Sequence, residues 1–134
     1  MQSKILIVEE QSKTTDRISA QLEENGYLTD ICHSTDELFS TFKAGAYVLM
    51  ILDLELANTD GFWLSEKIRD LDDNIIIFFL IGSIRHSHEI ITLFPIWAVS
   101  NFFDKPIIAD EIIEQVLETI KNDQRALRNF KKWS

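Results

Sequence analysis

The 134-residue sequence contains a single cysteine, Cys32, and no long apolar segment. One cysteine excludes an internal disulfide and suits a reducing compartment, and Cys32, in an alternating apolar stretch, is expected to be a buried, inert thiol. The longest apolar run, 75–81, is far too short to span a bilayer. Residues 1–11 lack a basic segment followed by an apolar one, so no secretory signal is indicated. These absences favour a cytoplasmic globular protein with no membrane partner.

Basic residues are also scarce, except near the C-terminal end. The formal charge of −9 argues against direct nucleic-acid binding by this domain. Residues 1–120 hold 8 basic and 21 acidic residues, a balance of −13, whereas residues 121–134 hold five basic residues and one acid, a balance of +4. We therefore expect one domain over residues 1–122, and a basic helical extension or the start of a linker over 123–134.

The sequence does contain a regular alternation of strand-like and helix-like patterns. Apolar runs typical of buried strands lie at 5–8, 27–32, 47–52, 75–81 and 100–104. Amphipathic segments typical of helices lie at 12–25, 34–45, 60–71, 83–99 and 110–121, and Pro95 interrupts the fourth. This alternation predicts an α/β fold, a doubly wound five-stranded parallel sheet in the order 2-1-3-4-5, covered by helices as a flavodoxin-like three-layer sandwich.

The helical segments also make predictions about single side chains. Ser34 followed by Glu37 has the spacing of a capping box, which places the start of the second helix. Phe39 in that helix is expected to face inward, and Trp63 in the third helix is interpreted as a packing residue.

Acidic residues follow three of the five predicted strands. Asp53 directly follows the third run, Glu9 and Glu10 follow the first, and Asp104 ends the last run and is followed by Lys105. In a sheet of this order the first and third strands are neighbours, so Asp53 and the two glutamates are expected to converge. Carboxylates with a lysine suit a divalent metal and a phosphoryl group. The structural alternatives are a helix cap at Asp53, a solvated loop at the glutamates and an ordinary surface lysine.

Taken in order, these segments resemble the receiver domain of two-component response regulators over residues 4–122. The resemblance rests on ILIVEE at 5–10, ILDLELANTDG at 51–61, a serine after the fourth strand, and FFDKP at 102–106. The resemblance implies that Asp53 is the phosphoacceptor and that Lys105 and Ser83 contact the phosphoryl group. It implies that Mg²⁺ is held by Glu10, Glu9, Asp53 and the backbone carbonyl of Glu55. Phe102 would be the aromatic switch residue. The resemblance also implies a cis peptide at Lys105-Pro106.

The same resemblance implies partners. A histidine kinase or phosphotransfer protein would donate the phosphoryl group, the face of the fourth and fifth helices would serve homodimerisation, and an output domain or protein would lie downstream. The domain would accept phosphate, with slow autodephosphorylation, and would not be a turnover enzyme. A phosphatase of the haloacid-dehalogenase type is disfavoured, because Asp53 lies far from the chain start and no cap domain is present.

Some residues depart from the usual receiver pattern. Both first-loop acids, Glu9 and Glu10, are glutamates, and Ile84 follows Ser83 where a small residue is usual. Phe102 lacks the hydroxyl of the common tyrosine. These departures leave open a degenerate receiver that acts as a phosphorylation-independent interaction module.

Overall fold

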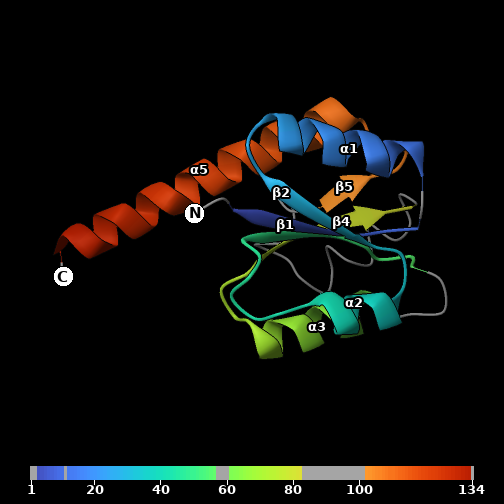
Figure 1. Ribbon diagram of the computed structural model, residues 1–134, viewed down its shortest axis with the longest axis horizontal. Coiled ribbons are helices and arrows are strands. Elements are labelled where there is room, and N and C mark those ends of the chain that lie inside the picture. The colour runs from blue at the N-terminus through green and yellow to red at the C-terminus, as the bar shows by residue number, and fades with distance from the viewer. Residues whose placement is uncertain (1–2, 11, 57–60, 83–101, 134) are drawn as a thin grey trace.

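The computed structural model of the chain describes residues 3–10, 12–56, 61–82 and 102–133 (Figure 1). The predictions for the fourth helical segment, including Ser83, Ile84 and Pro95, lie outside these residues.

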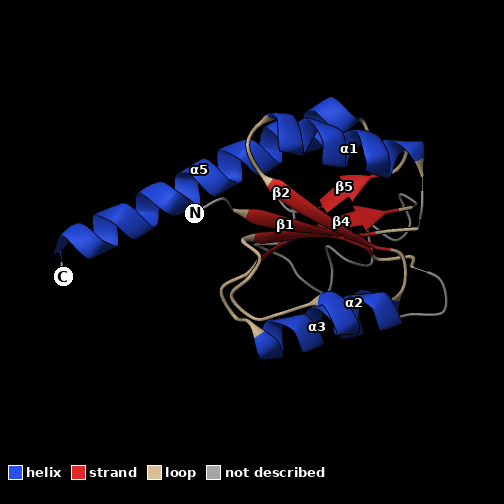
Figure 2. Ribbon diagram, in the orientation of Figure 1, coloured by secondary structure: helices blue, strands red, loops and turns tan. Residues whose placement is uncertain are grey.

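The described chain alternates strands and helices in the predicted order. The elements are β1 (Lys4–Val8), α1 (Lys13–Glu24), β2 (Leu28–Cys32), α2 (Thr35–Thr41), β3 (Leu49–Asp53), α3 (Gly61–Leu71), β4 (Ile76–Ile81), β5 (Phe102–Asp104) and α5 (Ala109–Trp133). All five strands pair in parallel, in the order β2-β1-β3-β4-β5, which confirms the predicted topology. Figure 2 shows α1 and α5 on one face of the sheet and α2 and α3 on the other.

Strand β3 is buried along its whole length because helices cover both faces of the sheet. Leu49 and Ile51 pack into the core beneath α1 and α5, whereas Met50 and Leu52 pack into the core beneath α2 and α3. Each of these side chains is fully buried, a contribution of about 1.5–3 kcal/mol per large apolar residue. The strand that carries Asp53 is therefore held on both sides.

Helix starts and stops follow local chemistry. Ser34 Oγ accepts the backbone N–H of Glu37 at 3.1 Å, as the capping pattern predicts. In a capping box the glutamate side chain accepts the N–H of the N-cap residue in return. Here Glu37 Oε2 accepts the N–H of His33 instead of that of Ser34. Gly26 and Gly45 adopt φ of 91° and 80° after the first two helices, a conformation that favours glycine.

Two aromatic residues, Phe39 and Trp63, lie outside the core and pack on each other, so the predicted inward position of Phe39 was wrong. Phe39 and Trp63 are 40% and 46% exposed, and their rings meet edge to face with centroids 6.3 Å apart. Lys67 Nζ lies 5.7 Å from the Trp63 ring centroid. Leu38 is the buried residue of the short helix α2, and Phe39, one position further, is rotated about 100° around the helix axis. The two rings shield each other on the outer surface.

Helix α5 continues beyond the amphipathic segment predicted at 110–121 and into residues 123–134, for which the sequence predicts either a basic helical extension or the start of a linker. It runs from Ala109 to Trp133, well past position 121. Its buried side chains end at Ile120 within the part whose side chains are described, and beyond it the helix extends away from the sheet (Figure 1). None of the described helices combines the length and apolar character needed to cross a bilayer.

Candidate functional site

Asp53 lies at the carboxyl end of β3, between the ends of β1 and β4. It is only 3% exposed. Its Oδ1 accepts the backbone N–H of Glu55 at 2.9 Å, and its Oδ2 accepts a hydrogen bond from Lys105 Nζ at 2.6 Å. Each oxygen of the carboxylate therefore has a donor, and Asp53 is a held carboxylate rather than a helix cap.

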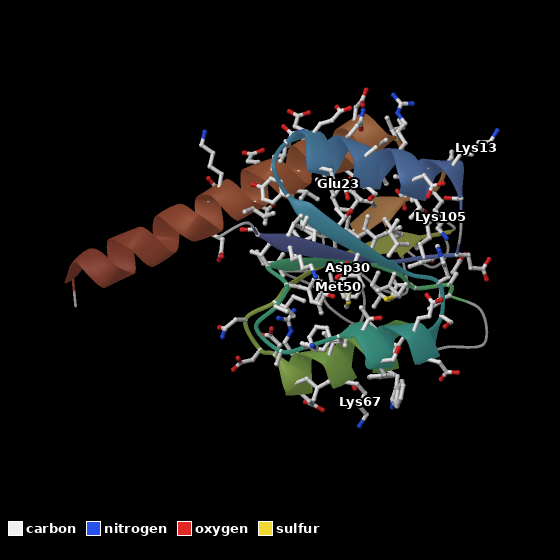
Figure 3. The ribbon with its side chains drawn as sticks, viewed as in Figure 1. Lys13, Glu23, Asp30, Met50, Lys67 and Lys105 are labelled. Atoms are coloured by element: carbon white, nitrogen blue, oxygen red, sulfur yellow. The ribbon has the colours of Figure 1, made fainter. Side chains whose placement is uncertain are left out.

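Lys105 reaches Asp53 from the end of β5. Its backbone N–H bonds to the carbonyl of Ile81 at 2.7 Å, which continues the β4–β5 pairing one residue past the strand. The peptide bond between Lys105 and Pro106 is cis, as predicted. The side chain of Lys105 is 27% exposed, and Figure 3 places it at the same end of the sheet as Lys13, which opens α1. The ammonium group is therefore partly accessible to an incoming anion.

The two glutamates after β1 have different environments. Glu9 is 7% exposed, and its Oε2 accepts a hydrogen bond from Thr15 Oγ1 at 2.5 Å. Its backbone is also fixed, because its N–H bonds to the carbonyl of Cys32 at 3.1 Å and its carbonyl lies 2.9 Å from His33 Nδ1. Glu10, by contrast, is exposed. The buried acid of the first loop is thus Glu9.

The charge of Glu9 is coupled to that of Asp53. Burial raises the pKa of the Glu9 carboxyl, the Thr15 hydrogen bond opposes that shift, and the negative charge of Asp53 raises the pKa further. Lys105 acts in the opposite direction, and Glu10 adds a small repulsion. The strand register agrees with this interaction, because Val8 pairs with Leu52 and Glu9 and Asp53 are the next residues on the two neighbouring strands. The predicted convergence of the first and third strand ends is therefore confirmed for Glu9.

Glu55 contributes both its backbone and its side chain to this region. While its N–H binds Asp53, its carboxylate lies directly against Gly82, just after β4. A Cβ at Gly82 would lie 1.9 Å from Glu55 Oε2. The absence of a side chain at Gly82 therefore makes room for an acid beside Asp53.

Phe102 and Ser83 complete the predicted set. Phe102 is half-buried at the start of β5, and its ring stacks on that of Phe79 with centroids 4.8 Å apart and an angle of 17° between the ring planes. Ser83 lies outside the described residues, so its place beside Asp53 remains a prediction.

Thr15 and His33 were missed by sequence reasoning. Both contact Glu9, one by its side chain and the other at its backbone. A hydroxyl three positions after the N-cap Ser12, within one helical turn of the first loop, was the available signal for Thr15. No comparable signal marks His33.

Comparison with known proteins identifies the class to which this fold and site belong. The pattern that defines the response regulator receiver domain matches residues 5–117. The chain therefore belongs to the response regulator receiver domain family, whose members accept phosphoryl groups and exchange signals with histidine kinases or phosphotransfer proteins and with output domains.

Particular relatives support the same assignment. The chain is 28% identical over 127 residues to hybrid signal transduction histidine kinase B of Dictyostelium discoideum, a match covering 86% of this chain and 6% of that kinase. The chain spans at most half the length of such curated relatives. A CheY-like receiver from Methanospirillum hungatei has a TM-score of 0.77 at 20% identity, covering 94% of this chain and 99% of that one.

A second solved structure, a response regulator from Burkholderia pseudomallei, contains a phosphorylated aspartic acid, a calcium ion and citrate. It has a TM-score of 0.68 at 21% identity, covering 95% of this chain and 75% of that one. At these identities the solved structures establish the fold alone.

Receiver domains generally bind Mg²⁺ at the phosphorylation site, and the donor set here is compatible with that ion. Within the described ranges, no three acidic, histidine or cysteine side chains form a ready-made metal cluster. Mg²⁺ does not require one, because it binds one or two carboxylates and completes its shell with water and phosphate oxygens. Asp53 and Glu9 supply two interacting carboxylates at one edge of the sheet.

Proposed function

We propose that this receiver domain accepts a phosphoryl group on Asp53 from a histidine kinase or phosphotransfer protein, in the presence of Mg²⁺, and thereby changes its affinity for partners. The observation that carries the proposal is the buried Asp53 carboxylate with Lys105 Nζ at 2.6 Å. A fixed carboxylate beside a partly accessible cation suits phosphoryl transfer, in which positioning and charge neutralisation supply most of the catalysis.

In the proposed reaction an oxygen of Asp53 attacks the phosphorus atom of the donor. An O–P bond forms, the bond from phosphorus to the donor's leaving atom breaks, and the leaving group retains the electron pair. The Glu55 N–H holds the orientation of the Asp53 carboxylate through Oδ1. Lys105 then exchanges its bond to Asp53 Oδ2 for one to a phosphoryl oxygen, as a mobile lysine can. Ser83 is proposed to donate its hydroxyl to another phosphoryl oxygen.

Mg²⁺ at this site would be held by Asp53, Glu10, Glu9 and the backbone carbonyl of Glu55, and when bound it would neutralise charge on the transferred group. The chain would release phosphate slowly and would not turn over an external substrate.

Signal output is proposed to use the face of the fourth and fifth helices. The ring of Phe102, now stacked on Phe79, would change its packing when Ser83 binds the phosphoryl group. Such a change would alter homodimerisation or the binding of an output domain or protein.

The proposal can be tested by intact-mass measurement after incubation with Mg²⁺ and acetyl phosphate. The unaltered chain is expected to gain the mass of one phosphoryl group, and Asp53→Asn to gain none. Asp104→Asn, at the end of β5 and separated from β3 by β4, is the matched control and should gain mass normally. No gain by the unaltered chain would overturn the proposal in favour of a phosphorylation-independent interaction module.

A further inference from the structure

Thr15 is a fully buried polar residue that contacts the loop after β1. It is 0% exposed and lies in the first turn of α1, three residues after the N-cap Ser12. Its Oγ1 donates to Glu9 Oε2 at 2.5 Å and lies 2.8 Å from Ser12 Oγ. A buried hydroxyl between a helix cap and a carboxylate links the orientation of Glu9 to the start of α1.

The direction of each hydrogen bond follows from the available protons. Thr15 has one hydroxyl proton, and the Glu9 carboxylate can only accept, so that proton points to Glu9. Ser12 must then donate its own proton to Thr15 Oγ1, while Ser12 Oγ accepts the Thr15 backbone N–H at 3.1 Å. The chain from Ser12 through Thr15 to Glu9 is therefore fully satisfied and has one arrangement.

This series of hydrogen bonds fixes one carboxylate oxygen of Glu9, Oε2, and leaves the other oxygen for a different partner. A glutamate has one more rotatable bond than an aspartate, so an unsupported Glu9 would sample several positions. Thr15 is branched at Cβ and sits within a helix, which restricts its own rotamer. The Glu9 carboxylate is thus held by a rigid donor from a different element, at the same sheet edge as Asp53.

We infer that Thr15 is a positioning residue for the metal site, holding the Glu9 carboxylate so that its second oxygen meets a divalent cation, directly or through water. The inference rests on the proposed function, because it concerns the proposed Mg²⁺ site. Hydrogen-bond partners of metal ligands commonly affect metal affinity tenfold or more. Thr15 thereby compensates for the longer acid at position 9.

The test is a titration with Mg²⁺ alone, followed by the backbone amide NMR signals of Glu9 and Glu55. Thr15→Val keeps the shape but removes the donor, and is expected to weaken Mg²⁺ binding about tenfold. Thr15→Ser restores the hydroxyl and should restore the affinity. Ser19→Ala is the matched control, since Ser19 lies on the same helix with its Oγ 2.6 Å from Thr29 Oγ1, and it should bind Mg²⁺ normally.

A second comparison tests whether Thr15 acts through Glu9. In a Glu9→Gln background, Thr15→Val should cause no further loss of Mg²⁺ affinity, whereas an equal further loss would overturn the inference. Thr15→Ala takes the place of Thr15→Val if the valine variant does not fold.

The remaining outcomes separate this inference from the proposed function. Equal or tighter Mg²⁺ binding by Thr15→Val, in a chain that still gains phosphate on Asp53, would overturn the role of Thr15 alone. Absence of Mg²⁺ binding by the unaltered chain would overturn both.

Discussion

Lys105 Nζ lies 2.6 Å from Asp53 Oδ2 although 52 residues separate the two along the chain. Parallel pairing of β3 with β4 and of β4 with β5 brings both residues to the same edge of the sheet. The side chains are 5% and 27% exposed, for Asp53 and Lys105 respectively. The carboxylate therefore depends on the lysine as its charge partner, while the lysine retains access to solvent.

Removal of this lysine is expected to affect both stability and reactivity. Lys105→Met keeps most of the aliphatic stem but leaves Asp53 Oδ2 without its donor, which should lower the free energy of unfolding by about 1–3 kcal/mol. Phosphoryl uptake should slow by about 100-fold, as when one charge-stabilising donor is lost. Urea denaturation and the time course of mass gain measure the two effects. Lys43→Met, at an exposed position, should change neither, and unchanged uptake by Lys105→Met would contradict the assigned role.

Two glycines near the site should respond differently to alanine. A Cβ at Gly61 would lie 2.6 Å from Leu54 Cα, and backbone cannot easily move away. Gly61→Ala should therefore lower the free energy of unfolding by about 2–3 kcal/mol. At Gly82 the obstacle is the Glu55 carboxylate, which can rotate, so Gly82→Ala should cost about 1 kcal/mol or less. Urea denaturation of both variants checks the order, and a larger loss for Gly82→Ala would contradict this account.

A pH-dependent contribution to stability is expected at Asp30, in the middle of β2. The Tyr47 hydroxyl donates to Asp30 Oδ2 at 2.6 Å, and this bond, with a smaller contribution from Lys4, holds the pKa of Asp30 below its ordinary value of 3.8. Because the folded-state pKa is the lower one, the stabilisation is complete above pH 3.8 and is lost as the pH falls through the folded-state value.

The corresponding variant is Tyr47→Phe. At pH 7 it should lower the free energy of unfolding by about 1 kcal/mol, a modest value because Asp30 is partly exposed to solvent. The difference from the unaltered chain should shrink as the pH falls below 3.8. Denaturation at several pH values checks this, with Tyr27→Phe as the control tyrosine. A difference that stays constant down to low pH would show that the Asp30 charge is not involved.

The domain boundary can be tested by shortening α5. Ile120 is its last buried residue among the side chains that are described. A chain ending at residue 123 should therefore keep its free energy of unfolding within about 1 kcal/mol. A chain ending at residue 115 loses Val116 and Ile120 from the core and should lose more than about 3 kcal/mol or fail to fold. A large loss on removal of residues 124–134 would place part of the extension within the domain.

The sheet order and the convergence of Asp53, Glu9 and Lys105 could be predicted because they follow from general rules. Apolar runs mark buried parallel strands, and the carboxyl ends of such strands meet at one edge. The contact between Thr15 and Glu9 could not be predicted in the same way, since it depends on the reach of one side chain between two elements. The pairing of Glu55 with Gly82 depends similarly on the spacing of β3 and β4.

The mistaken inward position of Phe39 has another cause. Apolar residues in a short helix do not define its inner face uniquely, and two aromatic rings can cover each other at the surface. The apolar pattern of α5 marks only the part that packs on the core, so the sequence left both a helical extension and a linker open for residues 123–134.

Helix α5 is packed in the core at one end and continues beyond the core at the other. Its first half is clamped in the core through Ile112, Val116 and Ile120, and the remainder continues without a break to Trp133. The 13 residues beyond Ile120 span about 20 Å at the helical rise, so a tilt of about 10° at the clamped end would displace the far end by about 3 Å. A change in core packing too small to alter the fold would thus displace the C-terminal end of α5 by about the diameter of an atom. That displacement would occur outside the core, where it would alter contacts with a bound partner.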